Sequence, residues 1–516
     1  MIMRLAAGHV PARSATLSTV LAVLFLTFLD TTVVSVALGN IQFDLGAGVI
    51  PLQWVVNAYS LVFASLMLTA GSLSDRLGRK WLMLIGIVVF CAGSVLCALA
   101  PSVGYVIGGR AVMGIGAAAA EPGTLSVLRQ IYPDRAQRAR ALGAWAAVAG
   151  LSLALGPVIG GLLVNAGSWR DVFWFNVAIG GLLFFLVLLF VPNSADPQPG
   201  HLDGGGFLLG SLALGSLIYA GISGEQYGYS TWWIVLLFVI SGVCAVAWVI
   251  VEKRVESPML DLEYLKNAAV SSALFLAFAV YFGIFSIFFL TALYLDLIVG
   301  YDGGQMAGVF APMAVGIVAG SVASGFWVGH VGPRGPMIVG SLLSAGGIVF
   351  ARFALVQHPH FAELALTLTV AGVGFGITVV PLTAAVLGHV PAAHSGMAAS
   401  ATNTARQLGA VVGVAALGAI VNSRLTSEFG ARLADRGVSG ASKNFILRML
   451  ETGGDAASGI DIAHPDPLIK PLVDDATAAF RSGLHLALIV SAVLIGVAAV
   501  LVALIPRGAL APDSEI

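Results

Sequence analysis

Long apolar stretches separated by short polar connections dominate the chain. Fourteen of these stretches, each about 17 to 25 residues long, are candidate membrane spans. They occupy residues 16–38, 52–72, 81–99, 104–127, 141–164, 172–191, 207–223, 232–251, 269–292, 306–328, 337–356, 361–385, 396–421 and 482–505. A backbone in lipid must satisfy its own hydrogen bonds, and apolar runs of this length do so as helices, whereas barrel strands are shorter and alternate. The pattern predicts an all-α integral membrane protein with fourteen transmembrane helices.

Composition agrees with this pattern. Apolar residues make up 58% of the 516 residues and charged residues only 10%, against roughly 25% charged in soluble domains. The net charge of −1 gives no basic field for nucleic acid. Cys91, Cys97 and Cys244 lie inside apolar runs, so we expect neither disulfides nor a metal site. The first apolar run is too long for a cleaved signal and reads as a span.

The distribution of cations predicts the orientation. With both termini inside, the inner segments carry most of the lysines and arginines, whereas the short outer loops carry only Arg170. Positive residues in short loops stay on the cytoplasmic side during insertion. We therefore expect a multi-pass protein of the cytoplasmic membrane with both termini cytoplasmic. The outer segment 422–481 escapes the rule because of its length, and we expect it to form an extracellular cap of short helices and loops.

Two similar loops suggest an internal repeat. GSLSDRLGRK (Gly71 to Lys80) follows the second expected helix, and GFWVGHVGPR (Gly325 to Arg334) follows the tenth. A duplicated six-helix unit with two helices inserted between the copies would give this offset, and parallel repeats of this kind build many transporters. A chance likeness between two glycine-rich turns is the alternative.

Four segments carry a resemblance to a known family. GSLSDRLGRK resembles the signature loop of the major facilitator superfamily. LDTTVVSVAL (Leu29 to Leu38), RAVMGIGAAAAEPGTL (Arg110 to Leu125) and GLSLALGPVIGG (Gly150 to Gly161) are similar to motifs of its fourteen-helix drug:proton antiporter branch. The second repeat loop departs from the pattern, with Gly329 where the first has Asp75.

The resemblance implies a fold and a domain division. We expect residues 1–191 to form one six-helix bundle and residues 268–516 a second, which includes the outer segment 422–481. Residues 192–267 would supply the two inserted helices and their cytoplasmic linkers. The resemblance also implies alternating access and export of lipophilic, often cationic, compounds driven by inward proton flow.

Buried charges mark the candidate coupling site, because a charge near the bilayer centre costs about 2.5 to 3.5 kcal/mol on insertion scales. Asp30 and Arg110 lie at similar depth in the first and fourth expected helices. If these helices face each other, the pair is neutral when Asp30 is ionised and breaks when Asp30 takes a proton. A fixed structural ion pair is the alternative.

Glu121 is a second candidate proton carrier. It follows Arg110 by eleven residues, which returns to nearly the same helix face about 16 Å further toward the cytoplasm. Pro122 and Gly123 weaken the helix beside it. A lipophilic cation could compete with a proton for this carboxylate, although an acid that only reaches headgroup water is the alternative.

Candidate substrate contacts come from two later helices as well as from Glu121. Asn403, Arg406 and Gln407 lie together in the thirteenth expected helix, where Arg406 either binds substrate or pairs with a carbonyl. The ninth expected helix carries an aromatic stripe that could stack flat compounds or pack against lipid: Phe275, Phe278, Phe282, Phe285 and Phe289. Of these we take Phe282 and Phe285 as substrate contacts.

Two glycine-containing segments are candidate gating elements. In the first loop, a charge cluster at the membrane surface could lock neighbouring helix ends, or merely anchor the loop inside; its residues are Gly71, Asp75, Arg76, Gly78, Arg79 and Lys80. In the fifth expected helix, small residues and a proline allow a kinked seam where helices slide, although such residues also occur in static bundles; the candidates are Gly156, Pro157, Gly160 and Gly161.

These features predict a proton-coupled antiporter that exports lipophilic, cationic or neutral, small molecules such as drugs, dyes and antibiotics. We expect a monomer with no cofactor, metal or nucleic-acid partner. Enzyme motifs such as H-E-x-x-H, G-x-S-x-G and G-x-x-x-x-G-K-[ST] do not occur. Open alternatives are an uncoupled or uptake facilitator on the same fold, and export of an endogenous metabolite, lipid, siderophore or self-made antibiotic.

Overall fold

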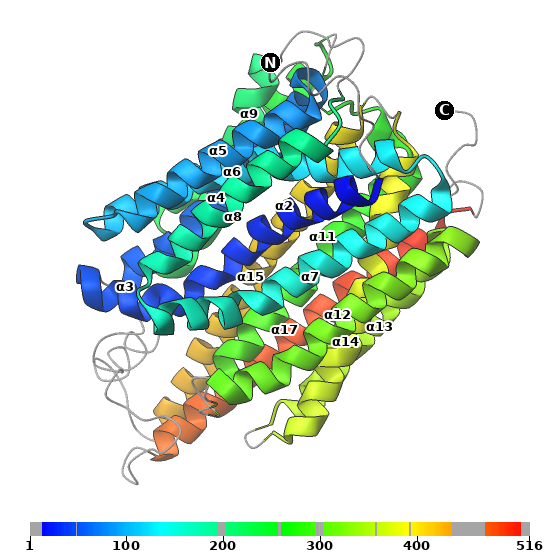
Figure 1. Ribbon diagram of the computed structural model, residues 1–516. Coiled ribbons are helices and arrows are strands. Elements are labelled where there is room, and N and C mark those ends of the chain that lie inside the picture. The colour runs from blue at the N-terminus through cyan, green and yellow to red at the C-terminus, as the bar shows by residue number, and fades with distance from the viewer. Residues whose placement is uncertain are drawn as a thin grey trace.

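The computed structural model describes residues 13–47, 49–194, 203–255, 260–295, 303–356, 359–391, 394–435 and 470–506, together with residues 258, 299 and 301. All of the long elements in these ranges are helices, and they run lengthwise beside one another (Figure 1). Figure 1 shows α4, α5, α6 and α8 on one side of the molecule and α12, α13, α14 and α17 on the other.

The first group of helices forms the N-terminal half. Its elements are α2 (Arg13–Val33), η1 (Val34–Ala37), α3 (Leu38–Leu45), α4 (Val49–Leu77), α5 (Arg79–Ala98), α6 (Val103–Ile131), α7 (Arg135–Ala166) and α8 (Arg170–Phe190). Helix α6 packs against α5 and α4, and α2 packs against α7 and α8. Within the first expected range, residues 16–38, the α-helix ends at Val33 and a short 3₁₀ turn follows.

The last group of long helices forms the C-terminal half. Its elements are α11 (Ala268–Tyr294), α12 (Gly303–Val331), α13 (Arg334–Ala354), α14 (Phe361–Gly388), α15 (Ser395–Asp435) and α17 (Lys470–Leu504). Helix α14 packs between α12 and α13, while α15 packs against α11 and α17. The halves meet where α4 contacts α15 and where α7 contacts α12.

Helices α9 (Gly204–Tyr227) and α10 (Trp232–Glu252) come between the two halves in sequence and pack against each other. Helix α9 also touches both halves, through α4 and α15. The tilted rings of Trp54 and Tyr219 have centroids 5.1 Å apart, and Tyr229, just after α9, donates a hydrogen bond to the carbonyl of Ala415 at 3.3 Å. Helix α10 exposes most of its apolar side chains, as a lipid-facing helix does.

The described helices coincide with all fourteen expected ranges. By length and apolar composition, twelve of the described helices could cross a membrane, and α7 and α11 are not among the twelve. The chain is thus an all-helical, multi-pass membrane protein, and the count of fourteen spans stays a prediction.

The outer segment 422–481 differs from the expected cap of short helices and loops. In its described parts, α15 continues without a break to Asp435, and α17 already begins at Lys470. Phe429 and Leu433 are buried against Ala479, because apolar positions four residues apart recur on one face of α15 beyond the expected span. Residues 436–469 lie outside the described residues.

Candidate functional site

Asp30 and Arg110 form an ion pair at the centre of the N-terminal half. Both side chains are fully buried, and Nη1 of Arg110 donates to Oδ2 of Asp30. The guanidinium also donates from Nε to the carbonyl of Val55 at 3.0 Å and lies 4.5 Å from the ring centroid of Tyr59. Asn176 donates to the other oxygen of Asp30 at 2.7 Å. The ionised carboxylate is thereby held by α6 and α8 at once.

Protonation of Asp30 would change the packing of this cluster. A neutral carboxyl gives up the ion pair and leaves the buried guanidinium without its counter-charge, which is costly in an apolar interior. The cluster can therefore couple one proton to the relative positions of α2, α6 and α8.

Glu121 belongs to a second buried cluster that joins the two halves. Its Oε1 accepts a hydrogen bond from Nδ2 of Asn403 at 3.1 Å, and Oδ1 of Asn403 accepts from Nη1 of Arg406 at 3.0 Å. Nη2 of Arg406 donates to Oγ1 of Thr383. Asn403 thus bridges an acid on α6 and a cation on α15, and we call Glu121, Asn403 and Arg406 the central triad.

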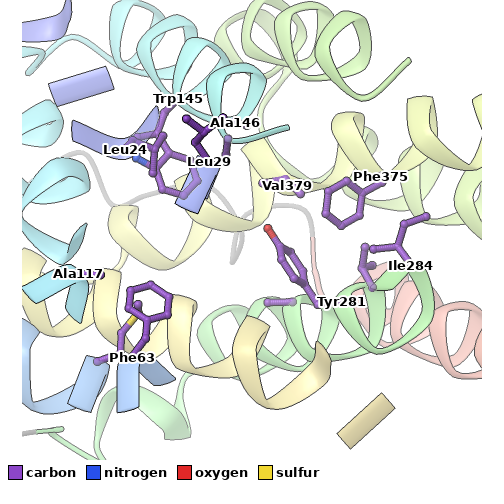
Figure 2. Packing of buried hydrophobic residues seen from close by; sticks show 14 of the residues in the cluster. Leu24, Leu29, Phe63, Ala117, Trp145, Ala146, Tyr281, Ile284, Phe375 and Val379 are labelled. Carbon is purple, nitrogen blue, oxygen red and sulfur yellow. The ribbon is translucent and has the colours of Figure 1, made fainter. Parts of the chain in front are cut away.

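Two aromatic rings flank the guanidinium of Arg406. Its Cζ lies 5.2 Å from the ring centroid of Trp145 on α7 and 5.6 Å from that of Tyr281 on α11. Figure 2 shows Trp145 beside Leu24 and Leu29, and Tyr281 beside Phe375. Nε1 of Trp145 donates to Thr124 at 3.0 Å. The cation is therefore held between apolar surfaces supplied by both halves.

The central triad retains unused hydrogen-bonding capacity. Among the described residues, Oε2 of Glu121 and Nε of Arg406 are buried and have no hydrogen-bond partner. Glu121 and Arg406 expose only 1% and 3% of their surface. Buried charged groups with free donors or acceptors are unusual, and they make this cluster a candidate functional site.

Asp75 joins the two halves at one end of the molecule. Its carboxylate accepts from the backbone N–H groups of Gly396 and Met397, both at 3.0 Å, where α15 begins. Nε and Nη2 of Arg79 donate to the same carboxylate at 3.2 and 2.9 Å. An anion at a helix N-terminus is stabilised by the free N–H groups and the helix dipole.

Small residues let the helices meet at this end. A side chain at Gly396 would place its Cβ 2.6 Å from the Asp75 carboxylate, and one at Gly71 would collide with Ser400. Gly78 has a φ of 99°, which favours glycine, and connects α4 to α5. Lys80 donates to the carbonyl of Leu188 at 2.7 Å, so it binds within its own half. Arg76 is half-buried beside these residues.

Arg129 also connects the two halves at the end that carries Asp75. Nη1 of Arg129, near the end of α6, donates to the carbonyl of Pro391 at 3.4 Å, and Nη2 donates to that of Val390. In the second repeat loop, Gly329 stands where the first loop has Asp75, so this position carries no charge. Gly329 on α12 packs against Ala136 on α7. Together, the contacts of Asp75 and Arg129 close this end between the halves.

The glycines of α7 form a close contact with α2. A Cβ at Gly160 would lie 2.6 Å from the carbonyl of Val33, and one at Gly156 would collide with Thr32. Gly161 has more room, since its Cβ would meet only Val36 at 4.0 Å. The backbone of Pro157 is helical, and its side chain lies outside the described ones.

Some candidate residues do not join the central triad. Gln407 is half-buried and forms no hydrogen bond within the described parts of the chain. Phe282 is buried, and its ring centroid lies 6.0 Å from that of Phe278 in the expected stripe. The side chain of Phe285 lies outside the described ones. Arg110 and Glu121 share a helix face but have different partners.

Trp145, Tyr281, Thr383 and Asn176 were not among the sequence candidates. Trp145 and Tyr281 sit in apolar runs, where an aromatic residue usually signals packing. The signal that could have found Tyr281 is its position one residue before Phe282 in the aromatic stripe. Asn176 is a lone amide in an apolar helix, which in lipid calls for a partner.

Comparisons with known proteins agree with this architecture. A model of the Major Facilitator Superfamily matches residues 20–414. The multidrug resistance protein Stp of Mycobacterium tuberculosis is 32% identical over 92% of this chain and 88% of its own. The methylenomycin A resistance protein of Bacillus subtilis is 35% identical over 82% and 91%. The multidrug efflux pump LfrA of Mycolicibacterium smegmatis is 32% identical over 95% and 96%.

A solved structure shows the same fold. The crystal structure of the human organic anion transporter MFSD10 (TETRAN) superposes with a TM-score of 0.62 at 13% sequence identity, covering 94% of this chain and all of that one. At this identity the likeness concerns the fold alone.

Proposed function

This chain belongs to the Major Facilitator Superfamily, and we propose that within it the chain is a proton-coupled exporter of lipophilic small molecules. Its relatives of similar length are multidrug and antibiotic resistance proteins, and it is a membrane transporter rather than an enzyme. We carry export over from those relatives, whereas proton coupling rests on the residues of this chain.

The buried Asp30–Arg110 pair is the observation that supports proton coupling best. Arg110 and Asn176 hold the carboxylate of Asp30 in its charged form, and in our proposal the cluster rearranges when this carboxylate takes up a proton. In our proposal, a proton from the outside neutralises Asp30 and releases α6, and the proton leaves to the cytoplasm when the ion pair re-forms. Because the two states favour different helix positions, the proton gradient biases the transporter's cycle.

Alternating access is part of the proposal, and the contacts between the halves support it. We assign the end that carries Asp75 and Arg129 to the cytoplasmic side, in line with the distribution of cations. The contacts with Gly396 and Val390 would then hold the inner gate closed and must break before substrate enters from the cytoplasm or inner leaflet. The glycine contact between α7 and α2 would let these helices slide.

We keep the domain division as part of the proposal. Residues 1–191 and 268–516 act as the two moving units, and residues 192–267 supply α9 and α10. We also propose a monomer in the cytoplasmic membrane with both termini inside. Asp30 and Glu121 carry protonation, Arg110 balances the charge of Asp30, and the central triad takes part in substrate binding.

Everted membrane vesicles test the proposal directly. With methylenomycin A as the probe, an acid-inside pH gradient should drive uptake by the wild type, and Asp30→Asn should reduce uptake to the passive leak. Glu263→Gln is the matched control, because Glu263 forms an exposed pair with Lys266 away from the helix bundle. Uptake that survives collapse of the gradient would rule out proton coupling and leave uncoupled facilitation.

A drug-susceptibility panel extends the test beyond one probe. A pump-deficient host that expresses the chain should tolerate higher drug concentrations, and a protonophore should remove that tolerance. Tolerance that is unaffected by the protonophore would contradict the coupling.

A further inference from the structure

We propose that the central triad selects substrates that carry an acidic group, with the guanidinium of Arg406 as the anchor for that group. This inference rests on the proposed export function and names its substrate class. It departs from the sequence-based expectation of cationic or neutral cargo, and the reason is the charge of the site.

Arg406 and Glu121 are the two charged residues at the centre of the described helix bundle that a substrate can contact. Asp30 and Arg110 neutralise each other, and both are fully enclosed in the N-terminal half. Arg352 lies near the end of α13, away from the central triad. Asp75, Arg79 and Arg129 lie at one end of the molecule, where they bind each other or backbone groups. Within the described helices, the charges of the central site are therefore those of one acid and one arginine.

This pair can be neutral or positive but never negative. A guanidinium stays protonated in proteins, whereas a carboxyl can take up a proton and become neutral. With Glu121 ionised the two charges cancel, and with Glu121 protonated the charge of Arg406 is left over. A cationic substrate would have to bind beside a permanent cation, while an anionic group finds an attractive site in the protonated state.

The geometry of Arg406 suits an acidic ligand. Nη1 and Nη2 are directed to Asn403 and Thr383, both neutral partners that an anion can replace. Nε is buried and, within the described chain, has no partner. Since a guanidinium presents its donors as a planar fork, a carboxylate or phosphate could bind it with two parallel hydrogen bonds.

The surroundings of Arg406 suit a flat apolar body behind that group. Trp145 and Tyr281 lie on either side of the guanidinium at 5.2 and 5.6 Å and come from different halves. Phe375 extends the surface, with its ring centroid 5.0 Å from that of Tyr281. An aromatic acid would therefore contact both halves while its acidic group binds Arg406.

Glu121 acts in this proposal as the internal competitor of the substrate. Its carboxylate reaches Arg406 through Asn403, so the empty site keeps its own charges balanced. Substrate binding requires this carboxylate to be protonated, which leaves the Asp30–Arg110 pair as the carrier of the counter-transported proton.

Equilibrium binding to the purified protein tests the inference with three probes that share one aromatic body. We choose 1-pyrenebutyrate, its methyl ester and 4-(1-pyrenyl)butylamine, which are anionic, neutral and cationic. The wild type should bind the acid at least roughly tenfold more tightly than the ester, the equivalent of about 1.4 kcal/mol, and the amine most weakly. Tighter binding of the amine, equal binding of all three, or binding of none would overturn the proposal.

Variants separate the role of Arg406 from a general loss of structure. Arg406→Gln should remove the preference for the acid and leave ester binding within about twofold, while Arg406→Lys should restore part of the preference. Glu121→Gln should tighten acid binding, because it removes the competing charge. The matched control, Arg352→Gln, removes a cation of the same half outside the triad and should behave as wild type.

The binding test is independent of the transport test. No pH gradient is present, so failure of proton coupling would leave the order of affinities intact. Conversely, an Arg406→Gln protein that loses acid and ester binding equally would refute the anchor role even if gradient-driven export were demonstrated.

Discussion

Replacing Asp75 with asparagine removes the charge of the carboxylate that joins α4 to the beginning of α15. In the wild type this carboxylate accepts two backbone N–H groups of α15 at 3.0 Å and is paired with Arg79. Asparagine has nearly the same shape but offers a single acceptor oxygen. Its N–H₂ group would face the N–H donors of α15 or of Arg79, which would then lack an acceptor.

The size of the effect follows from the lost contacts. A hydrogen bond to a charged group contributes about 1.5 to 3 kcal/mol, so the loss of one such bond weakens the closed inner gate by about 2 kcal/mol. In the proposed cycle these contacts exist only while the gate is closed, so the ratio of closed to open molecules should fall by roughly 30-fold.

Distances between spin labels measure this ratio. Labels on cysteines placed at Leu77 and Val331, which are exposed at the ends of α4 and α12, would report the separation of the halves by double electron–electron resonance. The background protein has its three cysteines replaced. Asp75→Asn should shift the distribution toward the longer separation.

The control is Asp134→Asn. Asp134 caps α7 by accepting from the backbone of Gln137 at 2.8 Å, a bond that stays within one half. Its removal should leave the distance distribution unchanged. An unchanged distribution in Asp75→Asn, or an equal shift in both variants, would refute the latch.

Three further outcomes are expected. Arg110→Lys should lower thermal stability by about 1 to 3 kcal/mol in detergent, since lysine offers one nitrogen where arginine uses two, Nε for Val55 and Nη1 for Asp30; an unchanged melting temperature would contradict this. Gly160→Val should destabilise the contact between α7 and α2 by about 1 to 3 kcal/mol and reduce export, while Gly161→Val should have little effect; equal melting curves would count against the seam. Hydrogen bonding from Arg170 lowers the pKa of Asp44, so Asp44→Asn should destabilise the protein at pH 7, with the difference from wild type disappearing as the pH falls through that lowered pKa. A difference that persists at lower pH would exclude this linkage.

Much of the architecture could be predicted because lipid imposes a simple rule on the sequence. Apolar runs of sufficient length must be helices, and every expected range coincides with a described helix. The short helix α3 lies almost wholly outside the expected ranges. Details that depend on packing were missed. Helix α2 gives way to a 3₁₀ turn at Val34 beside the close contact with α7, and α15 continues to Asp435 because Phe429 and Leu433 find a partner in α17.

A contact in the candidate site could be predicted where the position of each residue along its helix gives its depth in the membrane. Asp30 and Arg110 lie at matching depths in the sequence and pair in the structure. The hydrogen bond between Glu121 and Asn403 joins residues 282 positions apart, and helical periodicity carries no information about which helices face each other across the two halves. Trp145 and Tyr281 were missed for a related reason, since their aromatic character alone indicates only packing.

Proton movement measured together with substrate movement tests the central claim most directly. Proteoliposomes that contain the purified protein and an internal pH-sensitive dye would report protons released or taken up when methylenomycin A is added to one side, without any imposed gradient. The account predicts a proton flux opposite to the substrate flux that is abolished in Asp30→Asn and retained in Glu263→Gln. Substrate movement with no accompanying proton flux, or a proton flux that persists in Asp30→Asn, would contradict it.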